Sequence, residues 1–474
     1  MRKSWILMSL IIAAVVTAGV LLSASSVADS KKTAEPHKYN IVIITADAMR
    51  ADMLAANRES EVRTPHLDQL AEEGVNFTRA YCNITTTTPS HATLFSSLYP
   101  FDHKAYSNTS RISSKITTLP EILKSHGWHT AGIVNLPWLN SDVSNVPQGI
   151  DEFQSCVKIR KADKTNKWVM KFLDRQKGKK QPFFLWVHYI DTHTPYYAPG
   201  EYERMYYPKD KDPRAGKSGS LQKAWKMFPK HHQNNPFIDK WLRGITDADY
   251  VVATTKGSVS WTDHNVGEMI ARLKRNGQWE NTIFVFTSDH GESLGEHGLW
   301  FLHGGSFEVT ARVPLIIRVP GGPKNKRIDE LVSLVDIMPT LLTILKIDVP
   351  AQARGRDFWE SIQSRKLSGG AVLVEHAGAY IISVVTPRYK YIRHRKTKDV
   401  YPSYPMKKGK EELYDLEADP KELKNLIKVK PALAKELRKL LADLRSGKKE
   451  DFIGEKAKID EQTEEMLRSL GYTQ

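Results

Sequence analysis

Two short acidic segments could supply ligands for a metal ion. Asp47 follows the apolar run 40–45, and Asp289 and His290 follow a second such run, 282–287. Carboxylate and imidazole groups suit Zn²⁺, Mn²⁺ or another divalent ion, whereas an isolated aspartate at such a place is commonly a helix cap. Because three potential ligands follow two predicted strands, we favour a metal site over capped turns.

A run of four threonines, residues 85–88, precedes Pro89 and a predicted helix over 90–97. The unpaired N–H groups and the positive dipole end of a helix N-terminus attract anions. A hydroxyl that also contacts a metal ion is a candidate nucleophile, because the ion lowers its pKa. Without the metal motif, the preferred interpretation would be four threonines that act as caps and strand ends.

Four histidines also follow predicted strands. His188 and His193 come after the apolar run 183–187, and His297 and His303 lie close behind the Asp289 segment. Such histidines can bind an anionic oxygen or protonate a leaving group. A single histidine is more often structural, but four beside predicted metal ligands favour an active site.

The elements that position these residues alternate between strand and helix. This alternation predicts an α/β sheet covered on both faces, with ligands bound beyond the carboxyl ends of its strands. After residue 331 the pattern changes to a smaller α+β subdomain with short antiparallel strands. The predicted strands are 40–45, 129–134, 183–187, 282–287, 315–319, 371–374, 380–385 and 389–394, and the predicted helices are 90–97, 119–126, 167–176, 248–275, 334–345 and 431–445.

Composition narrows the range of partners. Among 474 residues, 69 Lys+Arg against 54 Asp+Glu give a net charge of +15, which favours anionic ligands. No nucleic-acid-binding motif is present, so we expect no nucleic-acid partner. Two cysteines, Cys82 and Cys156, exclude a four-thiolate zinc site; they form either one disulfide or two buried thiols. The basic segment 206–235 is either a lid over an anionic substrate or a solvated loop, and we favour the loop.

The N-terminus resembles an export signal. Arg2 and Lys3 precede the uncharged stretch 5–22, and small residues follow at 26–28. Residues 1–28 are therefore a cleaved signal peptide or a retained membrane anchor, and 29–38 a linker. We favour export with cleavage, to the periplasm or another extracytoplasmic site.

In five places the sequence resembles the sulfatase branch of the alkaline phosphatase superfamily. The resemblance implies an α/β fold with a central mixed, mostly parallel sheet sandwiched by helices, a catalytic domain over 39–330 and a C-terminal α+β subdomain over 331–474. The order and spacing of the five segments are specific, although each alone is loose. The segments are 47–52, 89–100, 288–292, 311–317 and 412–416.

The resemblance also assigns roles to residues. It makes Thr87 the nucleophile and His193 a contact for substrate oxygens, and it places His303 near a lysine position of sulfatases. We expect one Mn, Zn, Ca or Mg ion rather than two. The implied metal ligands are Asp47, Thr87, Asp289 and His290. A second ion would need further Asp or His ligands, for which Asp191, His193 and His303 are candidates.

The chain departs from the sulfatases at three positions. Sulfatases carry Cys or Ser, oxidised to formylglycine, within a Cys/Ser-x-Pro-x-Arg pattern; here Thr87 and His91 stand at the first and last positions. Ala48 replaces what is often a second aspartate ligand. In this respect Thr87 resembles the threonine nucleophiles of related branches of the superfamily. These branches are the nucleotide pyrophosphatase-like phosphodiesterases and the phosphoethanolamine and glycerolphosphate transferases.

We therefore predict an exported, metal-dependent hydrolase or transferase that acts on phosphate or phosphonate mono- or diesters. One alternative is a sulfuric ester hydrolase without formylglycine. Another is an inactive, metal-binding envelope protein that recognises anionic glycans or lipids. The predicted catalytic residues are Thr87, His193 and His303, and the predicted substrate-binding residues are His91, His188 and His297.

Overall fold

The protein is built around an eight-stranded sheet with strand order β12-β2-β11-β7-β1-β6-β4-β5. A computed structural model describes residues 38–469, except 60, 157–158, 217–218, 360–361, 363–369, 377, 447–451 and 453–456. The strands are β1 (Asn40–Ala46), β2 (Val75–Phe77), β4 (His129–Ile133), β5 (Glu152–Gln154), β6 (Phe183–Tyr189), β7 (Thr282–Thr287), β11 (Leu315–Arg318) and β12 (Lys326–Ile328).

Strand β1 lies between β6 and β7 and runs parallel to both. Thr45 of β1 is in register with His188 of β6 and with Thr287 of β7. All three strands are buried along their whole length, which explains their nearly continuous apolar sequences. Their carboxyl ends consequently meet at one edge of the sheet.

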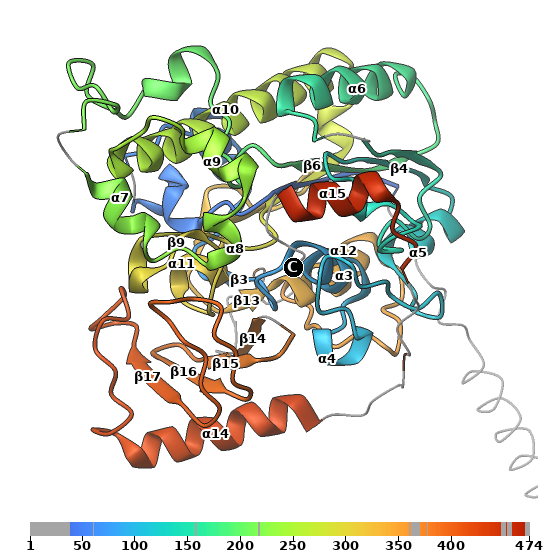
Figure 1. The fold of residues 1–474 in the computed structure, drawn as a ribbon. Coiled ribbons are helices and arrows are strands. Elements are labelled where there is room, and N and C mark those ends of the chain that lie inside the picture. Colours follow the sequence, from blue (N-terminus) through green and yellow to red (C-terminus); the bar gives the residue numbers. More distant parts are fainter. Residues whose placement is uncertain are drawn as a thin grey trace, which may run out of the picture.

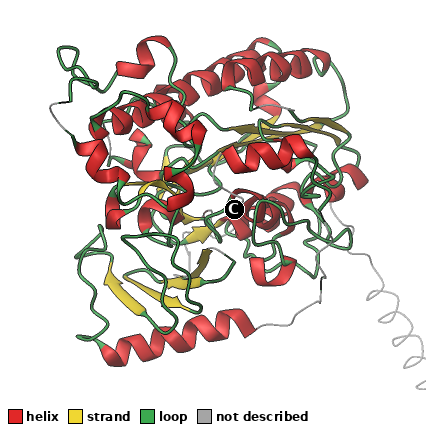
Figure 2. Ribbon diagram, viewed as in Figure 1, coloured by secondary structure: helices red, strands yellow, loops and turns green. Residues whose placement is uncertain are grey.

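Helices cover both faces of this sheet (Figures 1 and 2). Ile41 and Ile43 of β1 belong to one core, and Val42 and Ile44 to the core on the opposite face. Since β11 is antiparallel to its neighbours β2 and β7, the sheet is mixed but mostly parallel, and the predicted fold class is confirmed. The first core contains α3 (Thr87–Ser96), α5 (Leu119–Ser125) and α12 (Ile337–Leu345); the second contains α2 (Pro65–Glu72), α6 (Ala162–Arg175) and α10 (Ala248–Arg275).

A four-stranded antiparallel sheet with order β14-β15-β16-β17 forms the C-terminal subdomain, and α14 (Pro431–Ser446) packs on it. The segment leading to α3 is bonded to this sheet, because Ile84 forms a parallel bridge with Glu375 of β14. The strands are β14 (Val372–His376), β15 (Ile381–Val385), β16 (Tyr389–His394) and β17 (Glu411–Asp415).

Packing does not change at the predicted domain boundary after residue 330. Strand β13 (Val332–Ser333) pairs with β3 (Ala80–Tyr81), and α12 belongs to the large core. Near the C-terminus, α15 (Glu461–Ser469) returns to the large domain, where Leu467 is fully buried. These apolar segments complete the first core, so the antiparallel subdomain proper is shorter than 331–474.

The basic segment 206–235 contains two short helices and buried apolar side chains, so it is not the solvated loop that we favoured. It contains α7 (Ser220–Trp225) and α8 (Lys230–Gln233), and α9 (Pro236–Leu242) follows. Leu221 and Phe228 are buried in a core that also contains Phe301 of β9 (Trp300–Leu302). Apolar side chains spaced among the lysines anchor the segment.

Cys82 and Cys156 are free thiols, so the disulfide alternative is wrong. The predicted signal or anchor at 1–28 lies outside the described residues. Among the helices that the structure does describe, none combines the length and apolar character needed to cross a bilayer.

Candidate active site

Three strand ends bring Asp47, His188 and Asp289 together. Asp47 follows β1, His188 is the penultimate residue of β6, and Asp289 follows β7. One ligand atom from each lies within 4.8 Å of the others, and all three residues are buried. His188 Nε2 is 3.4 Å from Asp47 Oδ2. Parallel pairing of the strands therefore builds a compact oxygen and nitrogen cluster.

The chemistry of this cluster fits a divalent metal ion. Both carboxylate oxygens of Asp47, both ring nitrogens of His188 and Oδ2 of Asp289 are buried without a hydrogen-bond partner among the described residues. Such atoms are costly to bury unless something binds them. Burial, followed by the charge of Asp289, raises the pKa of Asp47, and burial also raises the pKa of Asp289. A cation would bind the unpartnered atoms and neutralise the two carboxylates.

His290 is oriented as a further ligand. Its Nδ1–H donates to the carbonyl of Gly291, so Nε2 is the basic nitrogen. Nε2 lies 3.6 Å from Asp47 Oδ1 and 3.5 Å from Asp289 Oδ2. Burial lowers the pKa of His290 to about 3, so the ring is neutral and able to bind a metal. Gly291 is required here because a Cβ would lie 2.2 Å from the carbonyl oxygen of Val309.

Ala48 contributes to the site through its backbone N–H, at the position where sulfatases often have an aspartate side chain. Ala48 has a left-handed conformation with φ of 59°, and its N–H donates to Asp289 Oδ1 at 3.2 Å. Its methyl group cannot bind an ion. At this position the backbone N–H therefore serves to orient Asp289.

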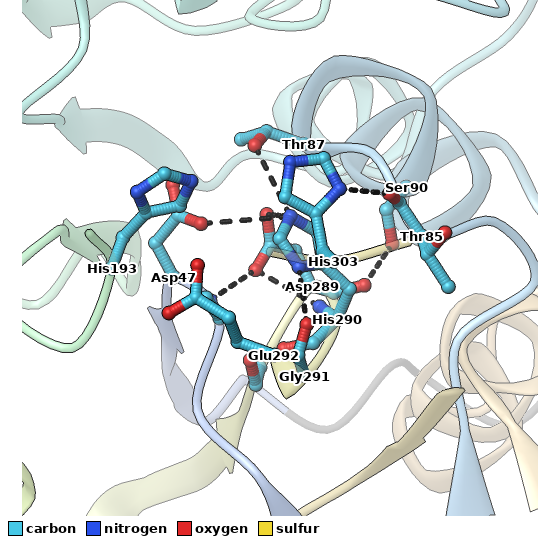
Figure 3. A network of polar contacts seen from close by, with 12 residues as sticks. Asp47, Thr85, Thr87, Ser90, His193, Asp289, His290, Gly291, Glu292 and His303 are labelled. Atoms are coloured by element: carbon cyan, nitrogen blue, oxygen red, sulfur yellow. Dashed lines mark hydrogen bonds and ion pairs between the residues drawn. The ribbon is translucent and has the colours of Figure 1, made fainter. Parts of the chain in front are cut away.

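Thr87 is the first residue of α3 and is fully buried. Its Oγ1 lies 3.5 Å from His290 Nε2, beside the carboxylate cluster (Figure 3). The helix begins three residues earlier than predicted, which places Thr87 itself in the first turn. Ser90 of the same turn donates to the carbonyl of Asp289 at 2.6 Å and thereby ties the helix to the turn that carries Asp289 and His290.

His193 and His303 flank His290 (Figure 3). The ring centre of His303 lies 4.5 Å from that of His290 and 5.9 Å from that of His193. Each ring donates its Nδ1–H to a backbone carbonyl, of Thr194 for His193 and of Thr85 for His303, so Nε2 is the basic atom. Burial lowers the pKa of both rings to about 3. Two neutral imidazoles thus lie near His290, whose Nε2 is 3.5 Å from the Thr87 hydroxyl.

Two predicted substrate-binding histidines are placed differently. His91 is fully buried, and its ring nitrogens contact the carbonyl of Thr87 at 2.8 Å and the hydroxyl of Thr45 at 3.0 Å. Both nitrogens are used by the protein, so His91 holds the first turn of α3 against β1. His297 stacks on Phe307 with ring centres 3.6 Å apart, because Phe307 provides an apolar face that the sequence did not indicate.

Asp191 does not join the cluster. Both of its carboxylate oxygens accept the N–H of Ala162, at 3.2 and 3.0 Å, where α6 begins. A second ion would therefore have His193 and His303 but not the predicted carboxylate.

A comparison with family models identifies the fold. The model described as "Sulfatase" matches residues 39–347, more than half of the chain. The chain belongs to the sulfatase family. A second model, "N-sulphoglucosamine sulphohydrolase, C-terminal", matches residues 295–447.

Relatives place this sulfatase-family chain among ester hydrolases. An arylsulfatase of Clostridium perfringens is 28% identical, and the match covers 88% of this chain and 96% of that protein. The phosphonate monoester hydrolase of Agrobacterium radiobacter has the same fold, with a TM-score of 0.67 at 20% identity over 86% of this chain and 95% of that one. A structure solved with its substrate D-glucosamine-2-N,6-O-disulfate also scores 0.67 at 20% identity, over 86% and 97% of the two chains. Sulfatase-family enzymes typically bind a divalent metal.

Sequence reasoning missed two residues of this sulfatase-family site. His188 was assigned to the substrate, although its place at the end of β6, next to β1, could have indicated a ligand. His376 of β14 gave no signal. Its Nδ1 is 2.7 Å from the hydroxyl of Thr85, and its Nε2 is 3.3 Å from the hydroxyl of Tyr401. The backbone carbonyl of the same Thr85 accepts the hydrogen bond from His303.

We expect His376→Ala to lower kcat about 10-fold with little change in KM, because the partner that holds Thr85, and through it His303, is removed. Steady-state kinetics and the melting temperature would be measured together. His376→Asn should restore most of kcat, since the amide nitrogen of asparagine can replace Nδ1. Tyr401→Phe, which removes only the contact to Nε2, is the matched control. A loss of melting temperature that accounts for the whole loss of activity would contradict the positioning role.

Proposed function

We propose that the protein is an exported, metal-dependent hydrolase or transferase of phosphate or phosphonate mono- and diesters, with Thr87 as its nucleophile. The observation that carries this proposal is the buried Thr87 hydroxyl, which lies 3.5 Å from His290 Nε2. It is beside buried carboxylate oxygens that have no hydrogen-bond partner among the described residues. Asp47, His188, Asp289 and His290 would hold one ion, Mn, Zn, Ca or Mg. When bound, that ion supplies a positive charge that lowers the pKa of the Thr87 hydroxyl and stabilises substrate oxygens.

The first chemical step transfers the phosphoryl group to the protein. Thr87 Oγ1 forms a bond to phosphorus while the bond from phosphorus to the leaving oxygen breaks. The hydroxyl proton passes through His303 or His193 to the leaving oxygen. The N-terminus of α3 faces the negative oxygens and stabilises them.

The second step restores the protein. Water, or an alcohol in a transferase, attacks phosphorus as the bond to Thr87 breaks. The proton released by the acceptor returns to Thr87 Oγ1, and the phosphoryl product leaves. His193 or His303 relays this proton.

A plain threonine nucleophile is better suited to cleaving phosphate esters than sulfate esters. A formylglycine hydrate releases sulfate by elimination through its second hydroxyl group. Thr87 has one hydroxyl, so its ester must be cleaved by displacement at the central atom. Phosphate esters tolerate such displacement with metal assistance.

The setting of the reaction is also part of the proposal. Export follows from the character of residues 1–28, with a membrane anchor as the alternative. The net charge of +15 suits an anionic substrate, either a small molecule, a glycan or a lipid headgroup, rather than a nucleic acid, which an exported protein rarely meets.

An ester panel tests the function directly. The purified protein would be given an aryl sulfate, an aryl phosphate, a phosphodiester and a phosphonate monoester, each with Mn²⁺, Zn²⁺, Mg²⁺ or Ca²⁺. We expect phosphorus esters to be turned over with kcat/KM at least 100-fold above that of the sulfate, about 2.7 kcal/mol in transition-state binding.

A sulfuric ester hydrolase is the second candidate, and the arylsulfatase among the relatives supports it. A preference for the aryl sulfate would establish that candidate and overturn our proposal. Absence of turnover on every ester with every metal, together with retained glycan or lipid binding, would instead support an inactive envelope protein.

A further inference from the structure

Glu292 lies in the turn after β7, close to the site, but has no part in the chemistry assigned so far (Figure 3). It is buried, with 2% of the residue exposed, and two hydroxyl groups bind its carboxylate. The hydroxyl of Thr194 donates to Oε1 at 2.9 Å, and that of Tyr196 donates to Oε2 at 2.5 Å. A buried carboxylate is costly unless hydrogen bonds satisfy it, so these two contacts keep Glu292 in place.

The same contacts connect two loops of the active site. Glu292 comes two residues after His290, and Thr194 directly follows His193 in the loop after β6. Because each carboxylate oxygen holds one hydroxyl group, the carboxylate cannot rotate freely and the spacing of the two loops is fixed. A shift of one loop relative to the other would break a charge-assisted hydrogen bond.

Thr194 passes this constraint on to His193. The carbonyl of Thr194 accepts the Nδ1–H of His193 at 2.6 Å, while Glu292 holds the hydroxyl of the same threonine. Without the carboxylate, that hydroxyl is left with a longer contact, to the carbonyl of Phe301 at 3.3 Å. A movement of Thr194 toward Phe301 would displace the carbonyl that keeps the proton on Nδ1.

We propose that Glu292 is a positioning residue for His193. It acts through Thr194, whose carbonyl selects the tautomer with the proton on Nδ1 and thereby leaves Nε2 basic. Glu292 itself does not touch the substrate. The expected effect on turnover rests on the proposed function, with His193 as its proton relay, whereas the effect on the tautomer does not.

Nitrogen-15 NMR of histidine-labelled full protein tests the tautomer without any turnover. The spectra would be recorded with Mg²⁺ or Zn²⁺ present, and His193→Gln identifies the signals of His193. We expect one tautomer, with the proton on Nδ1, in the unchanged protein and in Glu292→Gln, and a mixture of both tautomers in Glu292→Ala. Thr194→Val removes the hydroxyl but keeps the carbonyl, and should give the same mixture; it replaces Glu292→Ala if that variant does not fold.

Steady-state kinetics at saturating metal tests the consequence for turnover. Glu292→Ala should lower kcat about 30-fold with little change in KM, because a displaced proton relay slows the chemical step. Glu292→Gln should retain kcat to within about 3-fold, since its amide can accept from one hydroxyl and donate to the other. Once His193→Gln has removed the relay, Glu292→Ala should cause little further loss, because the two residues act as one unit.

Glu296→Ala is the matched control. Glu296 belongs to the same turn, and its carboxylate accepts hydrogen bonds from Arg50 and from the N–H of Leu294. Arg50 keeps its two hydrogen bonds to Asp52 in this variant. Both kcat and the His193 tautomer should therefore remain as in the unchanged protein.

Three results would overturn the proposal: an unchanged His193 tautomer in Glu292→Ala, an equal loss of kcat in Glu292→Gln and Glu292→Ala, or an equal loss in Glu296→Ala. A changed tautomer in Glu292→Ala, together with no turnover of any ester by the unchanged protein, would overturn the proposed function alone. Turnover by the unchanged protein, with a tautomer that does not depend on Glu292, would overturn the positioning role alone.

Discussion

Thr87→Ala is expected to abolish ester turnover, with a loss of kcat on the order of 10⁴-fold or more, as for other nucleophile deletions. Among the described residues, the one hydrogen-bond partner of the Thr87 hydroxyl is His290, so its removal should leave the fold in place. Rapid-quench kinetics and mass spectrometry would measure the outcome. In the unchanged protein we expect one phosphoryl group on the peptide that contains Thr87, and none in the variant.

The neighbouring threonine supplies a matched control. The hydroxyl of Thr88 donates to the carbonyl of Asn108 at 3.4 Å, away from the metal-binding residues. Thr88→Ala should therefore remain active, and Thr87→Ser, which keeps the hydroxyl, should retain measurable turnover. If Thr87→Ala and Thr88→Ala were equally active, the nucleophile would have to be another group.

Chelation of the metal is expected to remove both turnover and a large part of the thermal stability. An ion bound only by the folded state adds about 4 kcal/mol at a thousand times its Kd. We expect Asp47→Asn to lose most of the stability that the bound ion adds. The same variant without metal should be at least as stable as the unchanged protein, because it no longer buries two neighbouring carboxylates. Differential scanning calorimetry with and without each metal, after chelator treatment, measures both effects.

Two histidine variants separate metal binding from substrate binding. His188 lies 3.4 Å from Asp47, so His188→Gln should reduce the rise in melting temperature that the metal produces. His193 lies beside the cluster, so His193→Gln should lower turnover while the metal-dependent rise remains. If the metal raised the melting temperature of Asp47→Asn as much as that of the unchanged protein, the assigned metal site would be contradicted.

The parts of the site that follow directly from a strand were predictable from local sequence. Asp47 and the Asp289–His290 pair directly follow strongly apolar strands, and the parallel strands β1 and β7 place them at one edge of the sheet. The order of strands and helices was predictable for the same reason, because burial on both faces demands long apolar runs.

Residues that act through partners distant in the chain were not predictable. His91 was assigned to the substrate, but it bonds Thr45, 46 positions away. His376 contacts Thr85 across 291 positions, and no local pattern marks it. The segment 206–235 resembled a solvated loop because lysines dominate its composition, while its few apolar residues find their core only against α9, α10 and Phe301.

The sequence by itself determined the fold class, the sulfatase-like order of motifs and most of the candidate site residues. These depend on apolar periodicity and on residues adjacent to it in the chain. Only the tertiary structure decided which histidines face the cluster of Asp47 and Asp289, which ones support the backbone, and that the C-terminal subdomain reaches the loop before Thr87 through His376. The physical reason is that a side chain's role depends on where its polar atoms find partners, and those partners come from strands and loops that meet only in the folded chain.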